Sequence, residues 1–169
     1  MKRTAALFLT FFLLLFTFGS CSSISSDTSC QDLLRAMTDA EISLPAGKYY
    51  ELSAPEGDEK YLSPELIAVL FGGGSYPKVA EDWIDCALYL SLGKSPCEFA
   101  VILCKSRDAA HDTASLLQAR LAAIKQTQSS PEHAQMLENA SITLIGNYAL
   151  LIISSDTETA LRSAKRAIR

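Results

Sequence analysis

Residues 141–154 read SITLIGNYALLIIS, and this stretch decides the fold. Two runs of strand-forming residues, 142–145 and 148–154, flank the dipeptide Gly146-Asn147. A two-residue loop with glycine in first place is typical of a type II′ turn, which joins two antiparallel strands. The stretch therefore predicts a β-hairpin.

A second hairpin is predicted upstream, from the apolar runs 81–92 (EDWIDCALYLSL) and 98–104 (EFAVILC). The residues between them, GKSP, are turn formers. If the loop spans the five residues 93–97, Leu92 pairs with Glu98. In that register Cys86 lies directly opposite Cys104.

A helix is expected after each hairpin. Ser106 is a good N-cap for a long helix over 107–128, whose inward stripe has three- and four-residue spacing: Ala110, Thr113, Leu117, Leu121 and Ile124. Ser155-x-x-Glu158 is a capping box that opens a C-terminal helix. A shorter helix begins at Ser130-Pro131 and ends near Asn139. Two ββα units predict an α+β fold: a four-stranded antiparallel sheet with the helices packed on one face.

The segment before the first hairpin is less regular. Residues 30–41 fit a short amphipathic helix, and Pro64–Phe71 fit another, with Ser63 as N-cap and the glycines 72–74 as its end. Between these helices the chain is rich in proline, glycine and charge, and we expect irregular structure with one short strand around 49–52.

The N-terminus has the pattern of an export signal. Lys2 and Arg3 precede the apolar run 5–18, which spans about 21 Å as a helix against a bilayer core of about 30 Å. Small residues, ending in Ser20, then lead to Cys21, as in the cleavage site of a bacterial lipoprotein. The alternatives are an ordinary signal peptide with an incidental cysteine, or an uncleaved anchor.

This pattern sets the expected domain organisation. Residues 1–20 form a lipoprotein signal peptide, cleaved between Ser20 and Cys21. Residues 21–29 form a lipidated tether, and 30–169 form a single α+β domain. The Cys21 sulfur would carry a diacylglyceryl group, with palmitate-type chains, and two acyl chains give stable anchoring. The expected location is the outer face of the cell membrane.

Charge excludes one class of partner. The chain has 15 basic and 19 acidic residues, and loss of Lys2 and Arg3 with the signal leaves 13 against 19, a net charge of −6. Such an acidic balance argues against nucleic acid, whose phosphates require clustered Lys and Arg. It also argues against adsorption to anionic lipid, so the lipid anchor must hold the domain at the membrane.

Four cysteines remain in the mature chain: Cys30, Cys86, Cys97 and Cys104. Their spacing fits no zinc pattern, and no metal site is expected. Outside the cytoplasm a disulfide is chemically allowed, and Cys86 with Cys104 is the candidate pair. Directly opposite Cβ atoms lie about 4.5–5.5 Å apart, however, whereas a disulfide needs about 3.5–4.5 Å. Free buried thiols remain the alternative for all four.

No catalytic or cofactor-binding motif is present, and we expect the protein not to be an enzyme. Asp108, His111 and Ser115 share one helix face at i, i+3 and i+7, but a plain helix face offers no oxyanion hole, so a solvated face is expected. His133 is expected to be a surface residue. Gly72-Gly73-Gly74 follows a helix instead of a strand, which is wrong for a phosphate-binding loop.

Several segments resemble a family of uncharacterised lipoproteins from Gram-positive anaerobes. The resemblance covers roughly residues 30–158 and rests on LSPEL (62–66), ALYLS (87–91), EFAV (98–101), NASI (139–142) and GNYALLIIS (146–154). It implies a Gram-positive surface setting and, because the family is a domain of unknown function, no activity. Cys86, Cys97 and Cys104 do not belong to the family pattern.

The expected function is that of a membrane-anchored extracytoplasmic lipoprotein. Its partners would be the membrane lipid, through Cys21, and an unidentified protein of the cell envelope, for which it would serve as an interaction or accessory module. A small solute-binding lipoprotein is the alternative, and an envelope enzyme is the least favoured class.

Overall fold

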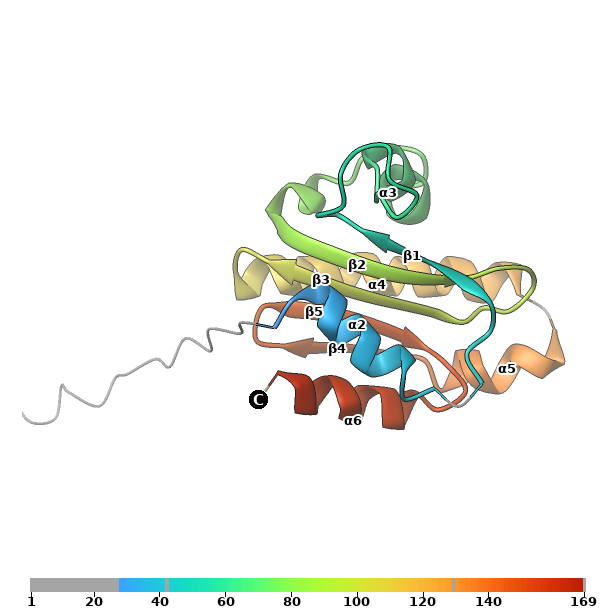
Figure 1. Ribbon diagram of the computed structural model, residues 1–169. Helices are drawn as coiled ribbons and strands as arrows, with labels where there is room; N and C mark the ends of the chain where they lie inside the picture. The colour runs from blue at the N-terminus through green and yellow to red at the C-terminus, as the bar shows by residue number, and fades with distance from the viewer. Residues whose placement is uncertain (1–27, 42, 129, 169) are drawn as a thin grey trace, which may run out of the picture.

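One antiparallel sheet of five strands forms the centre of the molecule (Figure 1). The computed structural model describes residues 28–41, 43–128 and 130–168. Within them the strands are hydrogen-bonded in the order β1-β2-β3-β5-β4. Their bounds are β1 Gly47–Glu51, β2 Trp83–Ser91, β3 Glu98–Cys104, β4 Ser141–Ile145 and β5 Tyr148–Ile153.

Five α-helices of the described residues pack against this sheet. They are α2 Cys30–Thr38, α3 Pro64–Phe71, α4 Arg107–Thr127, α5 Pro131–Glu138 and α6 Thr157–Ala167. A 3-10 turn, Lys78–Asp82, leads directly into β2. The α+β class is therefore confirmed.

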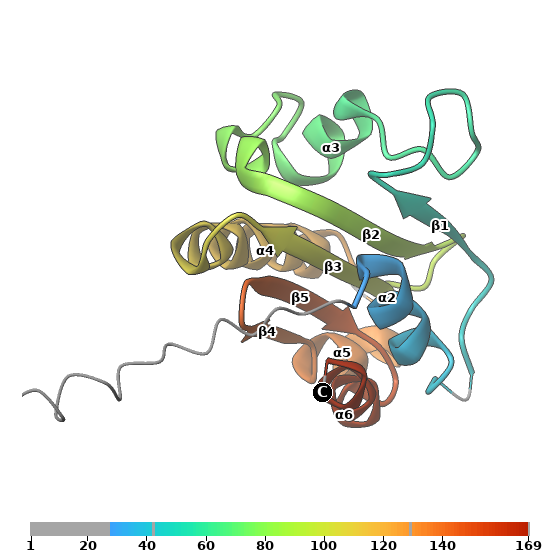
Figure 2. The same cartoon turned by 60° about the vertical axis from the view of Figure 1, so that its left-hand side comes forward.

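The helices cover both faces of the sheet, so the prediction of helices on one face is wrong. On β3, Ala100 and Ile102 belong to a core cluster shared with α3, α4 and α5, whereas Phe99 and Val101 belong to a second cluster shared with α2 and α6. Figures 1 and 2 show α2 and α6 on one side of the sheet and α4 on the other. The physical reason is visible in β5, where every residue is apolar and buried, a pattern that requires cover on both faces.

The predicted sheet also lacked a strand. The segment expected to hold an isolated short strand forms β1, which pairs with β2 along its whole length, from Gly47 opposite Ser91 to Glu51 opposite Ala87. Gly47 permits this pairing because the Tyr89 ring lies over it: a Cβ at position 47 would stand 2.3 Å from Tyr89 Cζ.

The hairpin of β4 and β5 is confirmed. Ile145 pairs with Tyr148 across the two-residue loop Gly146-Asn147. Gly146 has a φ of +59°, while no residue other than glycine in the described ranges has a positive φ, so Asn147 has a negative one. A positive φ in first place alone distinguishes the predicted type II′ turn from type I′.

The hairpin of β2 and β3 forms in a different register from the predicted one. Leu90, not Leu92, pairs with Glu98, and the Ser91 amide donates to the Cys97 carbonyl at 3.1 Å, which closes the loop at residues 92–96. A bulge between Trp83 and Asp85 shifts the far end by one more residue.

The register removes the geometric basis for a Cys86–Cys104 disulfide. Cys86 pairs with Ile102, and Cys104 pairs with Trp83. The two cysteines are therefore diagonal neighbours on the face that α4 covers, and diagonal Cα atoms lie about 7–8 Å apart. Both are free thiols in the structure, as are Cys30 and Cys97.

The helix starts follow the sequence closely. The Ser63 and Ser106 side chains accept from the backbone amides of Leu66 and Ala109, three residues on, as expected for N-caps. At α6 the N-cap is Asp156, which accepts from the Thr159 amide, and not Ser155. The predicted capping box at that helix is therefore wrong by one residue.

Candidate functional site

The predicted lipidation and cleavage residues, Cys21 and Ser20, lie outside the described residues, which begin at Thr28. The place where the tether joins the fold is nevertheless defined. Thr28 Oγ1 donates to the Ala167 carbonyl at 3.0 Å, and the Tyr148 hydroxyl donates to the Thr28 carbonyl. Tyr148 pairs with Leu103, so the chain enters the domain at the C-terminal end of β3.

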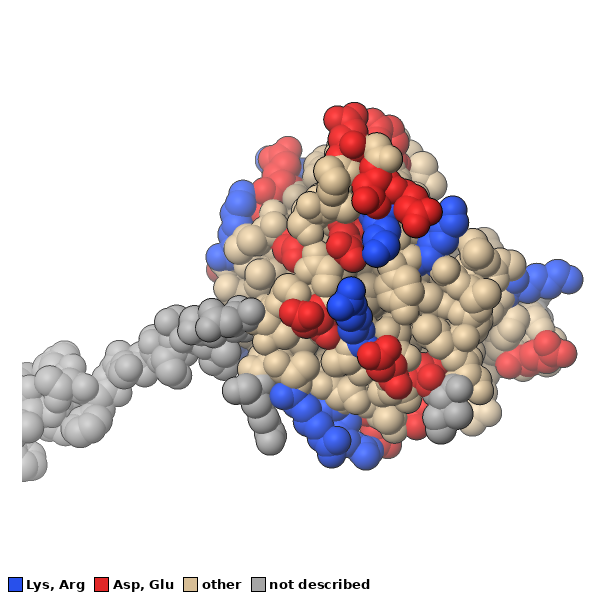
Figure 3. Space-filling view, in the orientation of Figure 1, with Lys and Arg blue, Asp and Glu red and all other residues tan. Residues whose placement is uncertain are grey.

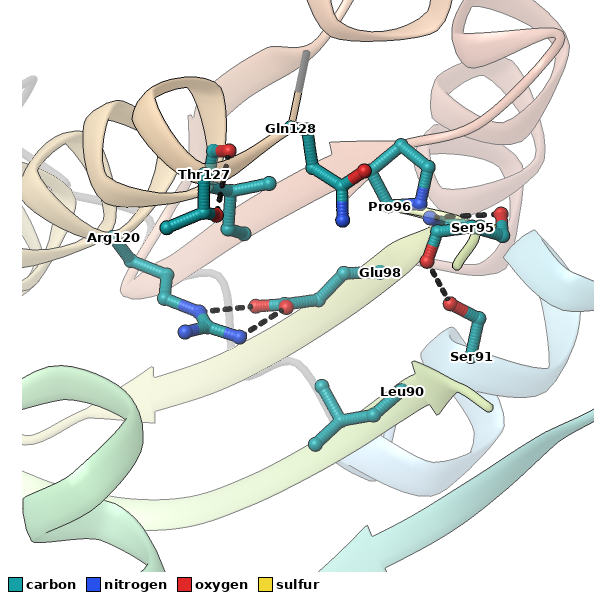
Figure 4. Close-up of a pocket in the computed structure, with 10 residues that line it drawn as sticks. Leu90, Ser91, Ser95, Pro96, Glu98, Arg120, Thr127 and Gln128 are labelled. Atoms are coloured by element: carbon teal, nitrogen blue, oxygen red, sulfur yellow. Dashed lines mark hydrogen bonds and ion pairs between the residues drawn. The ribbon is translucent and has the colours of Figure 1, made fainter. Parts of the chain in front are cut away.

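A polar pocket of about 270 Å³ lies at the opposite end of the same strand. Its walls come from the end of the β2–β3 hairpin and from the last two turns of α4 (Figure 4). It is lined by Leu90, Ser91, Ser95, Pro96, Cys97, Glu98, Arg120, Ile124, Thr127 and Gln128. β3 runs from Glu98 at the pocket to Leu103 near the tether, a separation of about 17 Å at 3.3 Å per residue.

An ion pair between Glu98 and Arg120 forms one wall of the pocket. Arg120 Nε donates to Glu98 Oε1 at 3.1 Å and Nη2 donates to Oε2 at 2.8 Å, a bidentate arrangement that fixes both side chains. Figure 4 shows the two side chains pointing at each other from α4 and β3. The Glu98 side chain is only 6% exposed and that of Arg120 is 22% exposed, so the pair is largely removed from water.

The hydroxyl groups around this pair are held by backbone contacts. Ser91 Oγ donates to the Ser95 carbonyl, and Thr127 Oγ1 donates to the Ile124 carbonyl at 3.0 Å. Ser95 Oγ accepts from the Cys97 amide at 3.3 Å. A hydroxyl that donates to the backbone keeps lone pairs free to accept. The pocket therefore presents oriented acceptors beside the guanidinium donors.

Cys97 lines the pocket but is poorly suited to nucleophilic chemistry. Burial, together with the nearby carboxylates of Glu41 and Glu98, raises the pKa of its thiol to about 12. Because the thiolate is the nucleophile, a thiol that stays protonated at neutral pH is unreactive. Burial likewise raises the pKa of Cys30, Cys86 and Cys104.

A second, larger pocket of about 610 Å³ adjoins the first and shares Ser95, Thr127 and Gln128 with it. Lys94 and His133 contribute to its lining. His133 was predicted to be exposed, yet it is half-buried, and its Nδ1 has no partner among the described residues. The two pockets together form a continuous polar hollow at this end of the domain.

The other sequence candidates are not brought together into a site. Asp108, His111 and Ser115 are all exposed on α4, and the Ser115 hydroxyl donates to the His111 carbonyl, not to an imidazole nitrogen, at 3.3 Å. Gly72 caps the C-terminus of α3. The described residues contain no group of three or more potential ligands that could hold a metal ion. Their helices include none that is long and apolar enough to cross a bilayer.

Charge is distributed unevenly over the surface. Figure 3 shows acidic side chains gathered over α3 and the connection before it, where Glu56, Asp58 and Glu59 are exposed. On the rest of this face both signs are interspersed. On this face the acidic side chains are therefore concentrated at the β1 edge of the sheet.

Sequence reasoning missed Glu98 and Arg120 as site residues. A signal was available for Glu98, since a carboxylate opens the otherwise apolar strand EFAVILC. Arg120 lies three residues after Leu117 and four before Ile124, at the border of the predicted apolar stripe of α4. Its partner could not be predicted, because only the fold brings it to Glu98, 22 residues away.

Comparison of the chain with protein-family models, with curated proteins and with solved structures finds no match. The resemblance to lipoproteins of Gram-positive anaerobes therefore stays a prediction.

Proposed function

We propose that the protein is an extracytoplasmic lipoprotein, anchored to the outer face of the membrane through Cys21, and that it serves the cell envelope as an interaction module. The observation that supports this most is that the tether and the polar pocket lie at opposite ends of β3. The tether enters the domain beside Tyr148, and the polar pocket opens at Glu98, at the other end of β3.

The length of the tether limits the distance between the domain and the membrane. Seven peptide units join Cys21 to Thr28, and at about 3.5 Å each they reach at most about 25 Å. The end of the domain near Thr28 would therefore stay close to the lipid headgroups. The pocket, about 17 Å further along β3, would face away from the membrane, where envelope components are accessible.

The anchor is tested by fractionating cells that express the wild type, Cys21→Ala or the control Ser23→Ala. We expect the wild type and Ser23→Ala in the membrane fraction, with diacylglyceryl on the N-terminal peptide by mass spectrometry. Cys21→Ala should be released or remain uncleaved. If Cys21→Ala is processed and stays membrane-bound like the wild type, the proposal is wrong.

The orientation is tested with a fluorophore on Lys94→Cys, in the loop beside the pocket, or on Asn147→Cys, in the β4–β5 turn near the tether; both positions are exposed. The four native thiols are buried, which protects them from labelling. In vesicles with an acceptor dye in the headgroup region, energy transfer should be stronger from position 147. Equal transfer from the two positions would contradict the orientation.

The solute-binding alternative draws support from the pocket itself. A concave site with a few convergent polar groups is the usual form of a small-molecule site. At about 270 Å³, it lies just below the range that drug-sized ligands occupy, so any such solute would be small.

A further inference from the structure

The pocket at the end of β3 combines many hydrogen-bonding groups with no net charge. Its charged residues are Glu98 and Arg120, which neutralise each other, and its remaining polar side chains are hydroxyls and one amide. We propose that this pocket binds a single neutral sugar ring, such as an aldohexose or an N-acetylhexosamine.

The charge balance decides between ligand classes. An anionic ligand would have to draw Arg120 away from Glu98, leaving a carboxylate that is 6% exposed without a partner. A cationic ligand would do the same to the guanidinium. Removing one partner of a buried pair is strongly unfavourable, so the site favours a ligand that leaves the pair intact.

The hydrogen-bonding pattern fits sugar hydroxyls, each of which donates and accepts. Arg120 uses Nε and Nη2 for Glu98, while Nη1 has no partner among the described residues and remains a donor. The two Glu98 oxygens each accept one bond from Arg120 and retain a lone pair. Thr127 Oγ1 donates to the backbone and is left as an acceptor.

Apolar side chains complete the site. Leu90 of β2, Pro96 of the loop and Ile124 of α4 line the same pocket as the polar groups. The faces of a sugar ring carry C–H groups, and these side chains can contact them while the ring edge meets the polar atoms. The volume of about 270 Å³ limits the bound portion to about one ring.

This inference rests on the proposed function only for the source of the sugar, since a pocket that faces away from the membrane meets envelope glycans. Binding itself does not require the lipid. The two proposals therefore fail separately: loss of the anchor appears in fractionation, and loss of the sugar site appears in a ligand titration.

The test uses the full mature protein in phosphatidylcholine vesicles, which carry no sugar. Saturation-transfer NMR and calorimetry would measure binding of glucose, N-acetylglucosamine, glucosamine (cationic) and glucuronate (anionic). At least one neutral sugar should bind in the millimolar range, at least fivefold tighter than both charged analogues. A soluble linear oligomer of the sugar that binds is titrated as well. Tighter binding of the oligomer than of the free sugar would indicate that the natural ligand is the end of a glycan chain, and equal or weaker binding would indicate the free sugar.

Two variants locate the site. Thr127→Ala should weaken binding about fivefold, as for the loss of one hydrogen bond. Ser115→Ala is the matched control, because it removes a hydroxyl from the same helix that also donates to a carbonyl, and it should leave affinity unchanged. Gln128→Ala provides a second pocket variant. The proposal is overturned if neither neutral sugar binds, if a charged analogue binds as tightly, or if Ser115→Ala weakens binding as much as Thr127→Ala.

Discussion

Replacing Arg120 by alanine is expected to lower the free energy of unfolding by about 3 kcal/mol. The structure supplies the reason. Both carboxylate oxygens of Glu98 are bonded to Arg120, at 3.1 and 2.8 Å, and its side chain is only 6% exposed. At an effective dielectric of about 20, charges about 4 Å apart attract by about 4 kcal/mol, and this attraction offsets the cost of desolvating Glu98. Without Arg120 that cost is uncompensated.

Replacing both partners by leucine should have a much smaller effect. A buried ion pair exchanged for apolar side chains of similar volume is often neutral or stabilising, because the desolvation cost disappears with the charges. Leu90 and Ile124 already provide apolar neighbours at this position. The double variant Glu98→Leu/Arg120→Leu should therefore lie within about 1 kcal/mol of the wild type.

Urea unfolding followed by tryptophan fluorescence measures both effects, since Trp83 is the single tryptophan of the chain and is buried. Arg162→Ala is the control, because its pair with Glu158 is exposed on α6 and should contribute no more than about 0.5 kcal/mol. If the double variant is as unstable as Arg120→Ala, the pair is needed for packing and the reasoning is refuted. The same holds if Arg120→Ala is as stable as the wild type.

Three further predictions concern stability. Thr113→Val removes the acceptor of the Trp83 indole N–H, which lies 3.0 Å away in the core, and should cost about 1–3 kcal/mol in urea unfolding, with a changed emission maximum. Gly47→Ala places a Cβ against the Tyr89 ring and should cost about 1–3 kcal/mol in thermal unfolding; an unchanged melting temperature would contradict the pairing of β1 with β2. The pKa of the Cys97 thiol is raised from 9.0 to about 12, so the folded state holds this proton more tightly than the unfolded chain. The contribution of the protonated thiol to the free energy of unfolding is therefore complete below pH 9 and is lost as the pH rises toward 12. In urea unfolding at several pH values, Cys97→Ala should reduce this loss.

Local signals in the sequence located most elements correctly. The turn at Gly146-Asn147 and the caps Ser63 and Ser106 depend on contacts within a few residues, and the structure has all three where the sequence predicts them. Such features need no knowledge of the rest of the chain, because the backbone groups that they satisfy are their own neighbours.

Features that depend on distant parts of the chain were predicted less well. The pairing of β1 with β2 depends on a glycine that accommodates the Tyr89 ring. The register of β2 with β3 depends on where the loop closes, and a bulge between Trp83 and Asp85 shifts only the far end. The unbroken apolar run of β5 indicates cover on both faces, whereas the two ββα units predicted helices on one face only. The spacing of apolar residues predicts which side chains are buried, but it does not predict which strand or helix covers them.

Stability alone is a poor explanation for Glu98. On the face of β3 that α4 covers, Ala100, Ile102 and Cys104 continue the row that Glu98 begins, and all three are buried in the apolar core. An apolar residue in that row would avoid the desolvation of a carboxylate and of the Arg120 guanidinium. The polar residue occurs at the one end of the row where hydroxyl groups gather around a pocket. A charged pair held rigid by two hydrogen bonds, at the end furthest from the tether, is an arrangement that a ligand can use and that the fold does not need.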